Sequence, residues 1–234
     1  MMIENTTRSK SRFAWVVYTM VFLFPFEVYR TTLPGNVRLT IFHGFVIGMF
    51  FYFLLQSISG RVRYEKSTVT VLLSMYLCAG VLSLLTAVDF FLAIKGLMTH
   101  LVLFLGFFYV LCFIKNRSEI EKAFTVMIIV GILVAVMALI QFFGFVLFQK
   151  MIFPPLIDYS NFTDAELFYK GQFGFMGGLM RPSAFFGSKE RMGSYLLIPF
   201  GLALFRGLYG RKHRLLYAGV SILLCTAIVL GLAR

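Results

Sequence analysis

Three cationic side chains, Arg181, Lys189 and Arg191, lie close together just before an apolar run that begins at Met192. Guanidinium groups bind phosphate oxygens through paired hydrogen bonds. The first turn of a helix also favours an anion, because its backbone N–H groups are unpaired. These residue types in this order therefore predict a site for a phosphate or a pyrophosphate. The alternative is that Lys189 and Arg191 bind lipid head groups, with Glu190 as a local partner.

None of these cations can act as a general base, because arginine stays protonated; that role needs a His, Asp or Glu. Lys95 and His100 lie inside an apolar run and are candidates for function at membrane depth. Alternatively, Lys95 extends to the membrane surface and His100 forms a hydrogen bond between helices. Asp89, in a tight turn, either helps to hold a substrate or caps a helix. No cluster has metal-ligand spacing and the three cysteines are isolated, so we predict no metal and no cofactor.

The elements that must position these groups are helices in a membrane. Hydrophobic residues make up 59% of the 234-residue chain and charged residues 14%, and the mean hydropathy is +0.86. A soluble domain is about half apolar and a quarter charged. The apolar runs reach the roughly 20 residues that a helix needs to cross a bilayer, without the alternation of barrel strands. We therefore predict an all-α transmembrane helical bundle with about seven spans, at 13–29, 39–58, 68–88, 90–114, 123–148, 192–209 and 215–233.

The net charge of +12 is distributed between the apolar runs instead of forming one stripe, which argues against nucleic acid as a partner. Basic residues near 8–12, 61–66, 115–122 and 211–214 would all lie on one side if the amino terminus is cytoplasmic. By the positive-inside rule we predict this orientation, with an uncleaved first span. Residues 1–234 would form a single transmembrane domain.

The connection 149–191 is the only long one and would lie outside the cytoplasm. Phe162 to Leu167 has the form of a capping box with a hydrophobic staple, which predicts a short helix over 164–170. The glycine-rich stretch 171–178 that follows either moves over a substrate or is an ordinary flexible connector. Long loops in compact proteins often carry function.

The run Arg181-Pro-Ser-Ala-Phe-Phe-Gly-Ser-Lys-Glu-Arg-Met-Gly-Ser-Tyr-Leu resembles the central motif of the O-antigen ligase and polymerase superfamily. Members read Arg-x-Ser-Gly-x-Phe-Gly, then a polar patch and Gly-x-Tyr-Leu. The stretch from Leu223 to Arg234 resembles the next span of the family, with Ala233 in place of a serine. Five spans before a long outer loop also fit the family. Two departures are Ala184, where glycine is common, and Lys189-Glu190, where Pro-Asn is frequent.

The resemblance implies a glycosyltransferase of the bacterial inner membrane that takes a glycan from an undecaprenyl-pyrophosphate carrier. The acceptor would be a glycan, a lipid or a protein. Arg181 would be the catalytic residue that stabilises the leaving pyrophosphate, and Lys189, Arg191 and Arg234 would help to bind it. The resemblance covers about the first half of a family member and places the general base in a later outer loop. We therefore expect residues 1–234 alone to bind the donor weakly and not to transfer sugar.

Two other functions use a similar chain. A transporter or flippase would also be a basic-lined helical bundle, but it predicts an internal repeat, broken spans and a site near the midplane. A noncatalytic partner in polysaccharide export would use the long loop for docking and would not need Arg181. Ligases and polymerases share these motifs, so the sequence does not distinguish between them.

Overall fold

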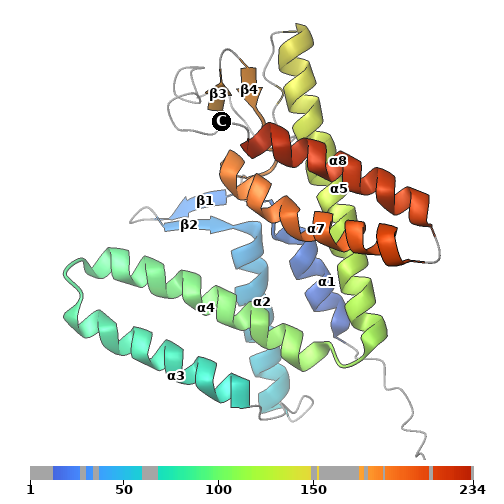
Figure 1. Cartoon of the computed structure of the whole chain (residues 1–234). Coiled ribbons are helices and arrows are strands. Elements are labelled where there is room, and N and C mark those ends of the chain that lie inside the picture. The colour runs from blue at the N-terminus through green and yellow to red at the C-terminus, as the bar shows by residue number, and fades with distance from the viewer. Residues whose placement is uncertain are drawn as a thin grey trace, which may run out of the picture. The chain divides into compact units, whose positions relative to one another are not determined.

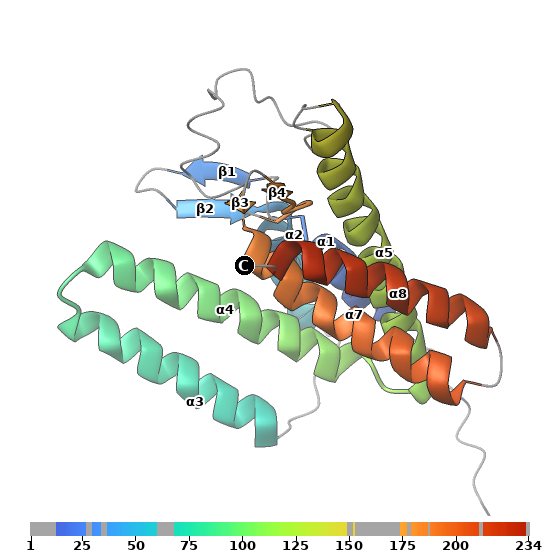
Figure 2. The same cartoon turned by 45° about the horizontal axis from the view of Figure 1, so that its top comes forward.

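The chain folds mainly into α-helices, as the sequence predicts (Figure 1, Figure 2). Its internal contacts form two compact units. The structure is a computed structural model, and it describes residues 13–26, 30–33, 37–59, 68–148, 152, 174–176, 179–186, 188–210 and 213–232.

A helix lies at each of the seven predicted ranges. The helices are α1 (Ala14–Leu23), α2 (Ile41–Ile58), α3 (Thr68–Ser83), α4 (Phe90–Phe113), α5 (Arg117–Phe148), α7 (Lys189–Tyr209) and α8 (Arg214–Leu232), with a 3₁₀ turn, η1 (Leu84–Thr86), after α3. Within the described ranges, α2, α4, α5, α7 and α8 are long and apolar enough to cross a membrane. The apolar helices at α1 and α3 are shorter. Seven crossings therefore remain a prediction.

Two short β-ribbons, which the sequence does not predict, lie in connections between helices. They pair β1 (Arg30–Leu33) with β2 (Val37–Thr40), and β3 (Gly174–Met176) with β4 (Leu179–Arg181). The second pair is antiparallel, and Gly174 stands opposite Arg181. The glycine-rich stretch 171–178 thus contains a strand at Gly174–Met176. The predicted helix at 164–170 lies outside the described residues.

Helix α5 begins at Arg117, whereas its apolar run begins near residue 123. The Glu119 carboxylate, which is buried, accepts hydrogen bonds from the backbone N–H groups of Lys115 at 2.9 Å and Asn116 at 3.3 Å. The hydroxyl of Tyr18 donates to the Glu119 carbonyl at 3.4 Å. These bonds resemble half of a capping box and hold a polar first turn. Hydropathy alone misses this turn because its residues are not apolar.

The first unit contains most of α1 and α2, all of α3 and α4, and the first turns of α5. Helices α3 and α4 lie side by side (Figure 1, Figure 2). Helix α2 contacts α4 through a buried hydrogen bond, in which the Tyr109 hydroxyl donates to the Val46 carbonyl at 3.0 Å. The Phe53 ring lies 4.6 Å from that of Phe113. Aromatic packing and one buried hydrogen bond therefore join α2 to α4.

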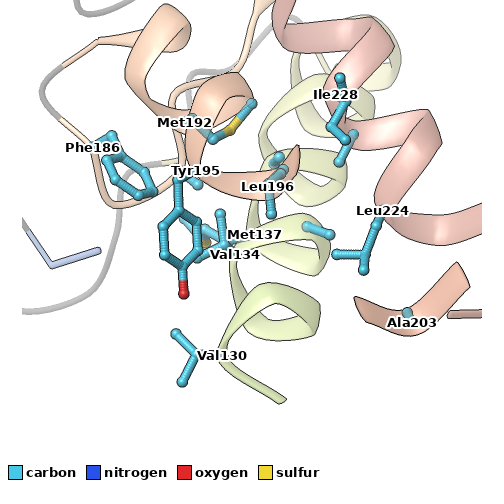
Figure 3. Close-up of a cluster of buried hydrophobic side chains, with 14 residues drawn as sticks. Val130, Val134, Met137, Phe186, Met192, Tyr195, Leu196, Ala203, Leu224 and Ile228 are labelled. Atoms are coloured by element: carbon cyan, nitrogen blue, oxygen red, sulfur yellow. The ribbon is translucent and has the colours of Figure 1, made fainter. Parts of the chain in front are cut away.

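The second unit contains most of α5, together with α7, α8 and the β3–β4 ribbon. Helices α7 and α8 lie side by side along their length (Figure 1, Figure 2). A Cβ atom on Gly131 of α5 would lie 2.7 Å from the Pro199 ring of α7, so glycine permits this close approach. The buried core joins all three helices, with Val130, Val134 and Met137 from α5, Met192, Leu196 and Ala203 from α7, and Leu224 and Ile228 from α8 (Figure 3).

Candidate anion site at the start of helix α7

The predicted cations belong to segments that meet at one end of the second unit. Arg181 is the last residue of β4, and β4 contacts α8. Lys189 and Arg191 occupy the first turn of α7. The end of α8 lies beside this turn, because a Cβ atom on Gly231 would lie 3.6 Å from the Lys189 carbonyl oxygen. Arg234 follows two residues after α8 and lies outside the described residues.

The turn between Arg181 and α7, formed by Pro182 to Phe186, is anchored in the core instead of lying on the surface. Pro182, Ser183, Ala184 and Phe186 are all buried. The backbone N–H of Phe186 donates to the Ser183 carbonyl at 2.9 Å and closes the turn. The backbone that enters this turn from Arg181 is therefore held in place.

Ala184 adopts a left-handed backbone conformation in this turn, with φ of 49°. A Cβ atom costs roughly 1–2 kcal/mol in that region, so glycine is the residue that fits best. The fold therefore tolerates alanine at this position at some steric cost.

Gln141 of α5 binds the backbone of this turn. Its Oε1 atom accepts hydrogen bonds from the backbone N–H groups of Ser183 at 3.2 Å and Ala184 at 2.8 Å. The two N–H donors fix the amide orientation, because the flipped amide would place its NH₂ group against them. The side chain is fully buried. Its Nε2 atom has no hydrogen-bond partner among the described residues.

The start of α7 is capped by Ser188. Its side chain accepts a hydrogen bond from the Arg191 backbone N–H at 3.3 Å. Lys189 is mostly buried, and its Nζ atom lies 3.8 Å from the carboxylate of Glu190, its local partner. An ion pair at this distance with an exposed partner is weak. Arg191 is exposed. The first turn thus presents two cations with one nearby carboxylate.

An aromatic cluster packs against the turn and the start of α7. The Phe26 ring lies 4.8 Å from that of Phe185, and the Phe24 ring stacks on Tyr195 at 5.9 Å. The Phe186 ring lies 5.2 Å from the Tyr195 ring in the core (Figure 3). The Tyr195 hydroxyl is buried without a hydrogen-bond partner in the part of the chain that the structure describes. Residues just after α1 therefore help to fix the turn that follows Arg181.

Of the residues that support this turn, the sequence could have indicated Gln141 but not Phe24 or Phe26. Gln141 is the only amide in the apolar run 123–148, and a polar group at that depth is a functional candidate on chemistry alone. Phe24 and Phe26 carry no such signal, because the chain contains 29 phenylalanines. Their role depends on a contact with residues far along the sequence.

The other ionisable candidates have separate, local contacts. Asp89 caps α4, and its Oδ1 atom accepts a hydrogen bond from the Leu92 N–H at 2.9 Å, which is the capping alternative. His100 is exposed on α4, and its ring lies 5.8 Å from that of Tyr76 on α3. Lys95 also belongs to α4. Among the described residues, no group of three His, Cys, Asp or Glu side chains could hold a metal ion.

Comparison with protein-family models, with curated proteins and with solved structures finds no match to this chain. The resemblance of the motif residues to the O-antigen ligase and polymerase superfamily therefore stays a prediction from the sequence.

Proposed function

We propose that this chain is a polytopic membrane protein with about seven spans and a cytoplasmic amino terminus. The five long apolar helices support this, since their length and composition suit a bilayer. In α2, only 22% of the helix's most apolar stretch is buried, and the same fraction is buried in α8. Large side chains such as Ile58, Leu147 and Leu215 are 68% to 89% exposed. Apolar surface of this extent is typical of proteins whose helices face lipid.

We further propose that the protein acts on lipid-linked oligosaccharide, transferring or polymerising it in the synthesis of a cell-surface polysaccharide. The observation that carries this proposal is the anchored turn at 182–186. The motif residues form a buried loop, its left-handed position coincides with the glycine of the family motif, and the loop leads from Arg181 directly into the first turn of α7. Such a loop fixes the backbone that follows Arg181 and precedes the cations of α7.

The chemistry that suits this arrangement is displacement at a sugar carbon. The bond between the anomeric carbon of the donor sugar and the pyrophosphate oxygen breaks, while an acceptor hydroxyl oxygen forms a bond to that carbon. The hydroxyl proton passes to a base, and undecaprenyl pyrophosphate leaves. Negative charge rises on the leaving oxygen, and a guanidinium group held in advance stabilises it. In this proposal Arg181 has that role, and Lys189, Arg191 and Arg234 bind the second phosphate.

Substitution of Arg181 in the intact gene product tests the proposal. We expect Arg181→Ala to lower transfer by about 10²–10³-fold, the effect of removing one donor that stabilises a transition-state oxyanion. Arg181→Lys should also fail if paired hydrogen bonds matter more than charge. Lys189→Ala should have a smaller effect, since its ammonium already lies near Glu190. The measurement is polysaccharide length on gels in a strain that lacks the native gene.

Arg117→Ala is the matched control, because Arg117 is an exposed arginine at the start of α5, paired with Glu121 at 3.2 Å. This variant should make polysaccharide of normal length. Membrane content of each variant is measured by immunoblotting. Normal length with Arg181→Ala at normal abundance would exclude glycan transfer at this turn and would favour the noncatalytic partner.

A further inference from the structure

A pocket of about 190 Å³ lies between α7 and α8, at the opposite end of these helices from the anchored turn. Its walls are mainly apolar side chains, including Leu204, Leu208 and Leu215. Leu215 is 89% exposed and Leu208 55% exposed, so the apolar walls continue to the outer surface of the helix pair. Such a surface needs an apolar neighbour.

A cation stands at the edge of this pocket. The Nε atom of Arg214 donates a hydrogen bond to the Gly207 carbonyl at 3.0 Å, which joins the start of α8 to the last turn of α7. A guanidinium group has five N–H donors, and the other four have no partner among the described residues. Arg214 is exposed, so these donors are accessible beside an apolar wall.

The charge around the pocket has no acidic counterpart nearby on α7 or α8, where Glu190 lies in the first turn of α7 at the opposite end from the pocket. Residues 191–234 contain no Asp or Glu. Arg206, one turn before the end of α7, is occupied by hydrogen bonds to Thr125 Oγ1 at 3.1 Å and to the Tyr217 hydroxyl at 3.2 Å. Arg206 therefore fixes α5, α7 and α8 together, while Arg214 supplies the accessible charge. An anion with an apolar tail would complement both features.

We propose that this pocket binds one anionic phospholipid, with an acyl chain along Leu204, Leu208 and Leu215 and the phosphate on Arg214. The proposal rests on the proposed membrane insertion and is independent of glycan transfer. The basic connection 211–214 lies on the predicted cytoplasmic side, where anionic lipid head groups attract arginine and lysine. A bound lipid would contact the last turns of α7 and the first turns of α8.

Lipid titration of the purified intact protein tests this site. Delipidated protein in detergent is titrated with dioleoyl phosphatidylglycerol or with dioleoyl phosphatidylcholine, and each bound lipid is counted by native mass spectrometry. We expect the first phosphatidylglycerol to bind about tenfold more tightly than phosphatidylcholine. Arg214→Gln should abolish this preference. Ala218→Phe, which fills the pocket, should weaken both lipids.

Arg117→Gln is the matched control, since it removes an exposed arginine away from the pocket. It should keep the tenfold preference. Circular dichroism and gel filtration confirm that each variant is folded before titration. Equal affinity of the unchanged protein for the two lipids would overturn the proposal, as would equal losses in Arg117→Gln and Arg214→Gln. Because no glycan is present, neither result bears on polysaccharide transfer.

Discussion

At the scale of one residue, the left-handed backbone of Ala184 predicts how a glycine at this position changes stability. Ala184→Gly removes the steric cost of a Cβ atom at φ of 49°, roughly 1–2 kcal/mol, and adds a smaller entropy cost to folding. We expect the melting temperature in detergent to rise by roughly 1–4 °C. Ala203→Gly is the control, because Ala203 is buried within α7 and glycine there lowers stability by about 1 kcal/mol. A lower melting temperature for both variants would contradict the prediction.

Gln141 shows how far residue types alone lead. A single glutamine inside an apolar run is recognisable as important, because a buried amide needs a hydrogen-bond partner. The identity of that partner is not recognisable, since Ser183 and Ala184 lie 42 and 43 residues further along the chain. The motif identifies Arg181, Lys189 and Arg191, but the residues that hold their loop depend on how α5 packs against α7.

At the scale of elements, the approach of α5 to α7 predicts a specific sensitivity. A Cβ atom on Gly131 would lie 2.7 Å and 2.9 Å from Cβ and Cγ of the Pro199 ring, which cannot rotate away. Gly131→Ala should therefore force the helices apart and cost about 1–3 kcal/mol, the usual effect of overpacking. Thermal unfolding in detergent measures this as a lower melting temperature.

Gly201→Ala provides the opposite expectation within α7. A Cβ atom on Gly201 meets nothing within 4 Å, and alanine is favoured over glycine inside a helix by about 1 kcal/mol. This variant should melt at a higher temperature than the unchanged protein. If Gly131→Ala raised the melting temperature as much as Gly201→Ala, the result would contradict the close packing of α5 on α7 at Gly131.

Hydropathy predicts the helices well and their polar ends poorly. Each apolar run became a helix because backbone groups bond within the segment. The start of α5 at Arg117 was missed because Glu119 pairs backbone N–H groups in a stretch of low hydropathy. The ribbons were missed for another reason. Strands of three or four residues have little alternation to detect, and their pairing is set by neighbours across the turn.

At the scale of the whole molecule, the distribution of charge predicts how the chain is oriented in the membrane. Basic residues near 8–12, 61–66, 115–122 and 211–214 favour one side of the membrane, and residues 149–191 would then lie on the other. Both proposed sites depend on this arrangement. The start of α7 would face the compartment where lipid-linked glycan is consumed, and the connection before α8 would face the anionic cytoplasmic leaflet. Reversal of the orientation would exchange the two environments.

Cysteine labelling in intact cells tests the orientation directly. In a protein whose Cys78, Cys112 and Cys225 are changed to serine, single cysteines are introduced by Val88→Cys, Lys122→Cys or Glu190→Cys, all at exposed positions. A membrane-impermeant maleimide should label the first and third in intact cells, because the predicted orientation places both connections outside the cytoplasm.

Lys122→Cys should react only after the cells are permeabilised, since Lys122 belongs to the basic stretch 115–122 that includes the first turns of α5. This variant is also the control for membrane integrity in the same experiment. Labelling of Lys122→Cys in intact cells, together with protection of Glu190→Cys, would place Lys189 and Arg191 in the cytosol. The cations at the start of α7 would then be separated from an extracytoplasmic pyrophosphate, and the glycosyltransferase proposal would fail even if α7 and α8 span the membrane as proposed.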